Sequence, residues 1–267
     1  MPVRSYLYVP GDRPERFSKA MGSGADAVIF DLEDAVPLNA KGGARDAVID
    51  FLSAPTETSV EAWVRINPGQ LGIDELGALH GSTGLAGIFA PKFTTAWLEE
   101  ASGALGDLRL VALVESAHAV LNMAAIAKCE QVSQLSLGEV DLAADLAMVP
   151  SLDGRELWPI RLSAVVASAA HGCGPPIGPV WLDLQDLDGL RSSTEELRRA
   201  GFGARQAIHP GQIEVINQAM SPTPTELDRA ERLLEMADEA GGGACVDDQG
   251  RMIDEAVLRS ARRLLGR

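Results

Sequence analysis

Residues 26–37 read DAVIFDLEDAVP, a short apolar run that ends in closely spaced carboxylates. The run is too short for a helix and is rich in branched apolar residues, which predicts a buried β-strand at residues 27–31. Similar runs recur along the chain, at residues 5–9, 62–66, 87–91, 108–114, 134–137, 179–182 and 204–207. Segments with the apolar spacing of helices separate or follow them, at residues 14–21, 40–52, 94–105, 117–127, 159–170, 193–200 and 210–219.

Strands that alternate with helices predict a parallel sheet, and eight of them can close into a barrel through right-handed crossovers. We therefore expect an α/β fold, a TIM (β/α)8 barrel, over residues 1–220; an open doubly wound sheet is the alternative. Past this point the pattern changes. Residues 226–240 and 255–265 predict helices on either side of a small hairpin at residues 244–253. We expect residues 221–267 to form a short helical appendage, which either belongs to the same domain or contacts another subunit.

The composition limits the class of protein. The chain has 267 residues and a net charge of −15, which argues against binding to nucleic acid or to anionic lipid. Its cysteines, Cys129, Cys173 and Cys245, lie far apart and form neither a zinc pattern nor a complete disulfide set, which fits a reducing compartment. The sequence contains no recognisable signal peptide and no apolar run of membrane-spanning length. We expect a cytoplasmic protein.

Acidic residues gather where the predicted strands end. In a barrel these ends meet at one mouth, where active sites are built. Carboxylates that share a pocket need a cation or shifted pKa values, and oxygen ligands in this number suit Mg²⁺. Asp31 taken alone is more simply a helix cap. As a group, however, the acids predict a metal site at the mouth: Asp31, Glu33, Asp34, Glu115 and Asp141.

The basic residues leave alternatives open. Arg65 ends a buried strand and needs a partner, which is either one of the acids or the substrate. Arg16 and Lys19 share one face of an early helix, where they either bind the phosphates of a CoA-type ligand or face solvent. His209 is either a base or, more simply, a cap beside Pro210. The sequence has no GxSxG, GxGxxG or P-loop motif.

Several motifs, taken in order, resemble those of one family. They are RSYLYVPGDRPERFSKA (4–20), DAVIFDLEDAVP (26–37), VRIN (64–67), PK (91–92), ALVESAHAVLN (112–122), LSLGEVDLAADL (135–146), AIHPGQIEVIN (207–217) and GRMIDEAVLRSARRLL (250–265). The chain resembles the citrate lyase beta-subunit-like proteins of the HpcH/HpaI aldolase/citrate lyase family, over nearly its whole length.

The resemblance implies a fold, a reaction and a set of roles. It implies a TIM barrel, Mg²⁺ as cofactor, and reversible cleavage of a 3-hydroxyacyl-CoA thioester of the malyl-, citramalyl- or citryl-CoA type into an acyl-CoA and a 2-oxo acid. Glu115 and Asp141 would ligate the metal, with Glu115 also at the substrate. Arg65 would contact the substrate, and Glu33 and Asp34 would lie around the metal with catalytic roles. A homotrimer or a multiple of it is also implied.

The sequence departs from the family pattern at several positions. His118 and Ala119 replace a usual Arg and Gly, Glu139 replaces an Ala, and Gly178 replaces an Asp. These changes bear on the choice of substrate more than on the metal. Two other functions remain open: an aldolase that acts on free 2-oxo acids without CoA, and a subunit that binds an acyl carrier protein bearing the thioester.

Overall fold

The computed structural model describes residues 3–54, 58–239, 245–247 and 249–267. The chain divides into two compact units, residues 1–220 and residues 221–267.

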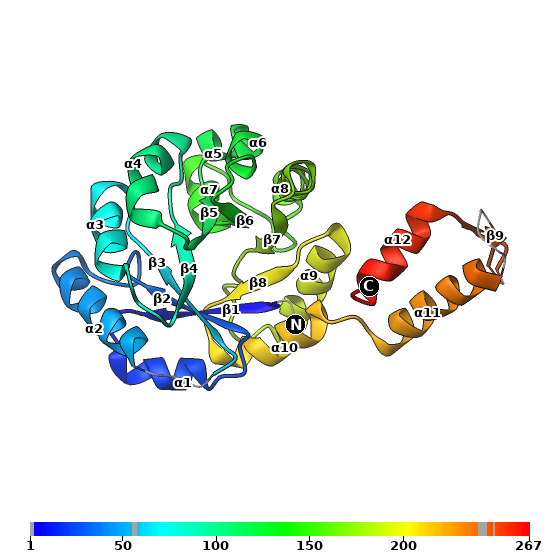
Figure 1. The fold of residues 1–267 in the computed structure, drawn as a ribbon, viewed down its shortest axis with the longest axis horizontal. Coiled ribbons are helices and arrows are strands. Elements are labelled where there is room, and N and C mark those ends of the chain that lie inside the picture. Colours follow the sequence, from blue (N-terminus) through cyan, green and yellow to red (C-terminus); the bar gives the residue numbers. More distant parts are fainter. Residues whose placement is uncertain (1–2, 55–57, 240–244, 248) are drawn as a thin grey trace. The chain divides into compact units, whose positions relative to one another are not determined.

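The first unit is built around a closed barrel of eight parallel strands in sequential order (Figure 1). Pairing of Ser5 with Arg205 joins the last strand to the first and closes the sheet. This confirms the predicted TIM barrel. The strands are β1 (Ser5–Pro10), β2 (Ala27–Asp31), β3 (Glu61–Arg65), β4 (Leu85–Ala90), β5 (Arg109–Val114), β6 (Val132–Leu137), β7 (Gly174–Gly178) and β8 (Ala204–Ala207).

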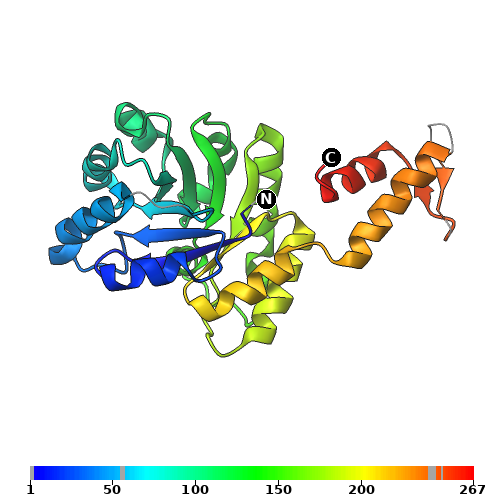
Figure 2. The same cartoon turned by 60° about the horizontal axis from the view of Figure 1, so that its bottom comes forward.

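Helices connect successive strands and surround the barrel (Figure 2). The predicted helix at residues 117–127 is broken at Asn122 into two short ones. The α-helices are α1 (Phe17–Met21), α2 (Lys41–Ser53), α3 (Gly69–Leu79), α4 (Thr95–Leu105), α5 (Ala117–Leu121), α6 (Met123–Ala127), α7 (Glu139–Asp145), α8 (Trp158–His171), α9 (Leu187–Ala200) and α10 (Ile213–Met220). Short 3-10 turns are η1 (Pro14–Arg16), η2 (Leu38–Ala40), η3 (Arg155–Leu157) and η4 (Pro210–Gln212).

The prediction of the seventh strand was wrong. We expected it at residues 179–182, but β7 comes earlier and has the sequence GPPIG. Proline donates no hydrogen bond to a ladder and is unusual inside a sheet, so the composition conceals this strand. The apolar run that follows is a loop instead, and Leu182 is 63% exposed there. The loop lies at the carboxyl end of β7, where it contributes to the mouth of the barrel.

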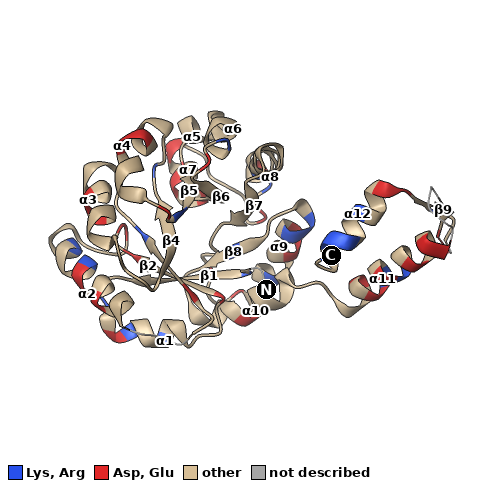
Figure 3. Cartoon of the chain, in the orientation of Figure 1, with Lys and Arg blue, Asp and Glu red and all other residues tan. Residues whose placement is uncertain are grey.

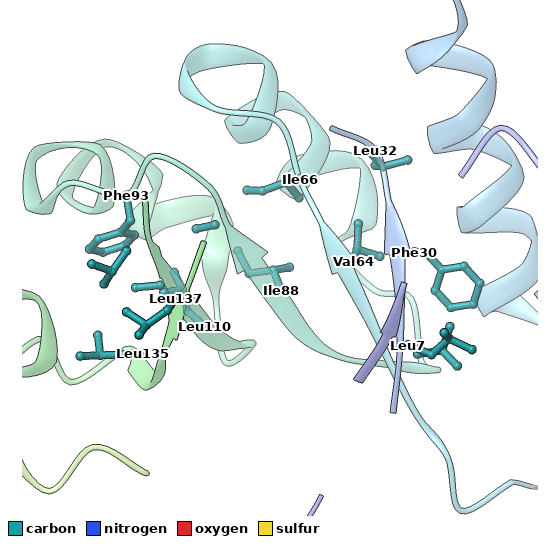
Figure 4. Packing of buried hydrophobic residues seen from close by; sticks show 14 of the residues in the cluster. Leu7, Phe30, Leu32, Val64, Ile66, Ile88, Phe93, Leu110, Leu135 and Leu137 are labelled. Atoms are coloured by element: carbon teal, nitrogen blue, oxygen red, sulfur yellow. The ribbon is translucent and has the colours of Figure 1, made fainter. Parts of the chain in front are cut away.

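Alternation along the strands divides the core into two layers. One layer packs between strands and helices, and Figure 4 shows part of it, including Leu7, Phe30 and Val64. The other layer contains Tyr6, Trp63 and Phe89, whose rings meet edge to face with centroids 5.4 to 5.9 Å apart. This second layer fills the barrel, so the functional site must lie at the mouth rather than along a central channel.

The second unit contains α11 (Pro224–Glu239), a two-stranded antiparallel hairpin of β9 (Cys245–Val246) and β10 (Met252–Ile253), and α12 (Glu255–Leu264). Ala240, the expected end of the first helix, lies outside the described residues. Figure 3 shows acidic residues along α11 and basic residues on α12. The apolar side chains of these elements pack together into a small core of their own: Leu233, Leu234, Met236, Ala237, Ile253, Val257 and Leu258.

Within the described residues, no helix combines the length and the apolar character that crossing a bilayer requires.

Candidate active site

A cavity of about 510 Å³ lies at the mouth of the barrel. Residues at or after the carboxyl ends of β1, β2, β3, β5, β6, β7 and β8 line it. Most of the residues predicted to lie at strand ends thus meet in this cavity. The polar and charged lining residues are Tyr8, Asp31, Asp34, Arg65, Glu115, Glu139, Asp141 and Gln206.

Arg65 is held rigidly on one side of the cavity. Its Nε and Nη2 atoms each donate to an oxygen of Asp31, at 2.6 Å and 2.6 Å. Asp31 lies opposite Arg65 in the register of β2 and β3, and it also accepts hydrogen bonds from the backbone N–H groups of Glu33 and Ala35. The ring of Tyr8 stacks on the guanidinium, 4.9 Å from its carbon. Asp31 is therefore both a turn cap and the structural partner of Arg65.

Two further carboxylates lie beside the free edge of Arg65. Its Nη1 atom is 3.0 Å from Glu33 Oε2 and 3.4 Å from Asp34 Oδ2. Glu33 Oε2 is buried and accepts no hydrogen bond from the described residues. Burial raises the pKa of Glu33, and the charge of Asp34 acts in the same direction while Arg65 opposes it. Glu33 therefore forms an ion pair with Arg65 through an oxygen that accepts no hydrogen bond from the described residues, and it has an increased tendency to take up a proton.

Glu115 follows β5, and the backbone directs its carboxylate toward the mouth. Its Oε1 atom accepts a 2.6 Å hydrogen bond from the N–H of Lys92, a residue in the left-handed region at φ +49°. A Cβ atom at Gly138 would lie only 2.8 Å from Glu115 Oε2, so glycine there makes room for the carboxylate. Burial raises the pKa of Glu115 to about 7, and the charges of Glu33 and Asp141 contribute to the shift.

Glu115 and Asp141 could hold a hard divalent cation. Asp141 lies in the first turn of α7 and its side chain is exposed. In the part of the chain that the structure describes, no three His, Cys, Asp or Glu side chains are grouped closely enough to bind a metal by themselves. Mg²⁺, however, usually binds through one or two carboxylates and keeps several waters. The like-charge crowding around Glu115 is what such a cation would relieve.

Glu139 lines the cavity but is fully engaged by a residue that sequence reasoning missed. Both of its oxygens accept hydrogen bonds from Arg161 of α8, at 2.6 Å from Nε and 2.7 Å from Nη2. The guanidinium also stacks on Trp158 at 5.1 Å. The sequence shows only an arginine within an amphipathic helix. The pairing depends on how α7 and α8 pack, and nothing in the local pattern indicates it.

A polar network that includes two lining residues of the cavity was also missed. The Tyr8 hydroxyl donates to Gln206 Oε1 at 2.7 Å, and Gln206 Nε2 donates to Ser136 Oγ at 2.7 Å. Burial raises the pKa of Tyr8, so its hydroxyl stays protonated and neutral. The sequence signal for this network was the presence of polar residues within otherwise apolar strands, because a buried polar group needs a hydrogen-bond partner.

Two basic residues proposed for phosphate binding do not line the cavity. Arg16 lies in η1, with its side chain 62% exposed and 4.0 Å from Glu15, and Lys19 is exposed on α1. Both follow β1, on the mouth side of the barrel. His209 caps η4, because its Nδ1 atom accepts the N–H of Gly211 at 3.1 Å. The cap interpretation of His209 is therefore the correct one.

The model of the HpcH/HpaI aldolase/citrate lyase family matches residues 4–210 of this sequence. The chain belongs to this family. It is therefore an enzyme of the aldolase and citrate lyase class. The match spans the barrel and every strand that contributes to the cavity.

Relatives and solved structures of this family are similar over nearly the whole chain. A (3S)-malyl-CoA thioesterase from Cereibacter sphaeroides is 34% identical over 272 residues, covering 100% of this chain and 94% of the relative. Citrate lyase subunit beta from Escherichia coli is 31% identical, covering 99% and 92%.

The crystal structure of protein CitE from Mycobacterium tuberculosis with magnesium, acetoacetate and coenzyme A has a TM-score of 0.85 and 32% identity, covering 99% of this chain and 97% of CitE. CitE has also been solved with magnesium and pyruvate, and the citrate lyase beta subunit from M. tuberculosis has been solved with oxaloacetate and magnesium.

Proposed function

We propose that this protein is a Mg²⁺-dependent carbon–carbon lyase that cleaves a 3-hydroxyacyl-CoA thioester, of the malyl-, citramalyl- or citryl-CoA type, reversibly into an acyl-CoA and a 2-oxo acid. The observation that carries the proposal is the meeting of Glu115, Asp141 and a rigidly held Arg65 in one cavity at the barrel mouth. The complex of CitE with magnesium, acetoacetate and coenzyme A supports the cofactor and the coenzyme A half of the substrate, and the complex with magnesium and pyruvate supports the 2-oxo acid half.

Glu115 and Asp141 would hold the Mg²⁺ ion. When bound, the ion supplies a Lewis acid and a template for the carboxylate and hydroxyl or carbonyl oxygens of the 2-oxo acid half. Gly138 supports this role because it leaves space beside Glu115 Oε2, and the Lys92 N–H fixes the other oxygen.

Arg65 would stabilise the negative charge that develops during cleavage. In that step the hydroxyl proton moves to a base, and the electrons of the broken carbon–carbon bond pass to the thioester, whose enolate then takes up a proton to give acyl-CoA. Asp31 and Tyr8 hold the guanidinium in place before substrate enters, and such preorganised charge is the effective kind. Glu33 and Asp34 would supply the base, because the raised pKa of Glu33 favours proton uptake.

Arg16 and Lys19 would contact the phosphates of CoA, since both are exposed and follow β1 on the mouth side. We further propose that the protein works in the cytoplasm as a homotrimer or a multiple of it, with residues 221–267 as an appendage that contacts a neighbouring subunit. The exposed arginines of α12 and the acids of α11 are consistent with a polar contact of this kind.

Thioester hydrolysis is a second candidate function, favoured by the 34% identity to a (3S)-malyl-CoA thioesterase. The products separate the two functions. A lyase releases a 2-oxo acid and an acyl-CoA, whereas a thioesterase releases free CoA and a hydroxy acid. Incubation with malyl-, citramalyl- and citryl-CoA, followed by chromatography of the products, decides between them. An aldolase on free 2-oxo acids would leave all three thioesters intact.

The metal assignment is tested by calorimetric titration with Mg²⁺. Glu115→Gln and Asp141→Asn should each abolish measurable Mg²⁺ binding, because each change removes the negative charge of one metal-binding carboxylate. The size of the side chain stays the same, so circular dichroism should remain that of the folded protein. Asp183→Asn is a matched control, since Asp183 is an exposed acid of the mouth that caps its own loop. Unchanged affinity in both test variants would refute the metal site.

A further inference from the structure

One side of the cavity carries three apolar side chains beside its polar ones. Val140 at the start of α7, Val180 after β7 and Ile208 after β8 all line it. Because β6, β7 and β8 are neighbours in the barrel, these three side chains give this side of the cavity, which also holds Glu139, Asp141 and Gln206, an apolar wall. Val140 is 53% exposed and Ile208 is 40% exposed, so this apolar wall faces the open cavity.

Cations are scarce around the cavity, and those present are already paired. Of the described lysines and arginines, Arg65 is the one that lines it; it donates two hydrogen bonds to Asp31 and forms an ion pair with Glu33. The ammonium of Lys92 lies 3.4 Å from Glu33.

The guanidinium of Arg161 binds both oxygens of Glu139. The carboxylates of the cavity thus outnumber its cations, and a bound divalent ion would offset only part of the difference.

From this wall we infer the substrate class, an inference that rests on the proposed lyase function. The 2-oxo acid half of the substrate carries no second carboxylate; its substituent is hydrogen or a small alkyl group. The thioester is therefore of the malyl or citramalyl type and not of the citryl type.

The physical reason is the cost of placing a charge on the apolar wall. A second carboxylate there would lose water and would find no unpaired lysine or arginine among the described residues that line the cavity, which is strongly unfavourable for an ionised group. It would also lie near Glu139 and Asp141, whose negative charges repel it. A methyl group in the same position would instead bury apolar surface against Val180 and Ile208.

The relatives do not decide this point. CitE has been solved with pyruvate, and the citrate lyase beta subunit from M. tuberculosis with oxaloacetate; these ligands carry a methyl group and a carboxymethyl group on the 2-oxo acid. The inference therefore depends on the wall of this chain's own cavity.

Two ligands that differ in one group provide the test. 2-Oxobutyrate and oxaloacetate share the same carbon chain, but one ends in a methyl group and the other in a carboxylate. We would titrate the full-length protein, saturated with Mg²⁺, with each freshly dissolved acid by calorimetry. The expected result is that 2-oxobutyrate binds roughly tenfold or more tightly than oxaloacetate.

A substitution in the apolar wall tests whether the wall itself causes the preference for 2-oxobutyrate. Val180 is half-buried in the loop after β7, where a longer side chain can extend into the cavity. Val180→Arg should improve oxaloacetate binding relative to 2-oxobutyrate by about tenfold, while Val180→Leu, the uncharged control, should keep the preference of the natural protein. Ile208→Arg tests the same wall from β8.

Equal or tighter binding of oxaloacetate by the natural protein would overturn the inference even if Mg²⁺ and 2-oxo acids bind as proposed. If neither acid binds in a Mg²⁺-dependent manner, the proposed function itself fails, and the inference fails with it. The two failures are therefore distinguishable in one set of titrations.

Discussion

Replacing Arg161 with methionine should strongly destabilise the barrel unit. The Arg161 and Glu139 side chains are 7% and 12% exposed, and their two hydrogen bonds connect α8 to the first turn of α7. Gly154 lies close to the guanidinium, because a Cβ atom there would be 3.0 Å from Nη2. Methionine fills much of the same volume but leaves the Glu139 carboxylate in a largely buried position without a partner.

The size of the effect follows from that burial. Removing one member of a buried ion pair typically costs about 3–5 kcal/mol, because the remaining charge is desolvated and unpaired. A typical domain has a total stability of only about 5–15 kcal/mol, so the loss would be a large fraction of it. Replacing both members, by Arg161→Met and Glu139→Leu together, should cost far less than the single change, because no charge remains buried.

The measurement is the free energy of unfolding from urea titration followed by circular dichroism. Arg155→Met is the matched control, because Arg155 is 73% exposed in its pair with Asp153 and its loss should leave the unfolding curve unchanged. A cost below about 1 kcal/mol for Arg161→Met, the value typical of an exposed pair, would show that the reasoning is wrong. So would a double variant as unstable as the single one.

Two further predictions concern catalysis and assembly. Arg65→Lys keeps the charge but cannot reproduce the paired hydrogen bonds to Asp31, so kcat should fall by roughly 10²-fold or more in steady-state assays; near-normal turnover would mean that Arg65 has a purely structural role. A variant that ends at Met220 removes residues 221–267 and should lose the oligomer in light-scattering measurements while circular dichroism still shows a folded barrel. Retention of the oligomer would contradict the proposed role of the appendage.

Local pattern predicted most of the fold. The run at residues 27–31 is a buried strand, and so are most of its counterparts, because short apolar runs bounded by polar residues fit a strand buried on both faces. The strand β7 escaped prediction because its Gly-Pro-Pro sequence lacks the composition of a strand. The small core of residues 221–267, in which Leu233, Leu234 and Leu258 pack together, was not predicted, because it depends on how the elements of this unit fold onto one another.

The sequence by itself also located the mouth, because parallel strands present all their carboxyl ends on one side and the acids follow those ends. Only the tertiary structure decided the pairing. Asp31 pairs with Arg65 because β2 and β3 place the two residues in register. Glu139 pairs with Arg161, which lies 22 positions away in the sequence. Periodicity reports which residues of one segment are buried, whereas partners from different segments depend on register and helix packing, which no local pattern contains. The meeting of Val140, Val180 and Ile208 with these acids in one cavity is likewise a product of closing the barrel.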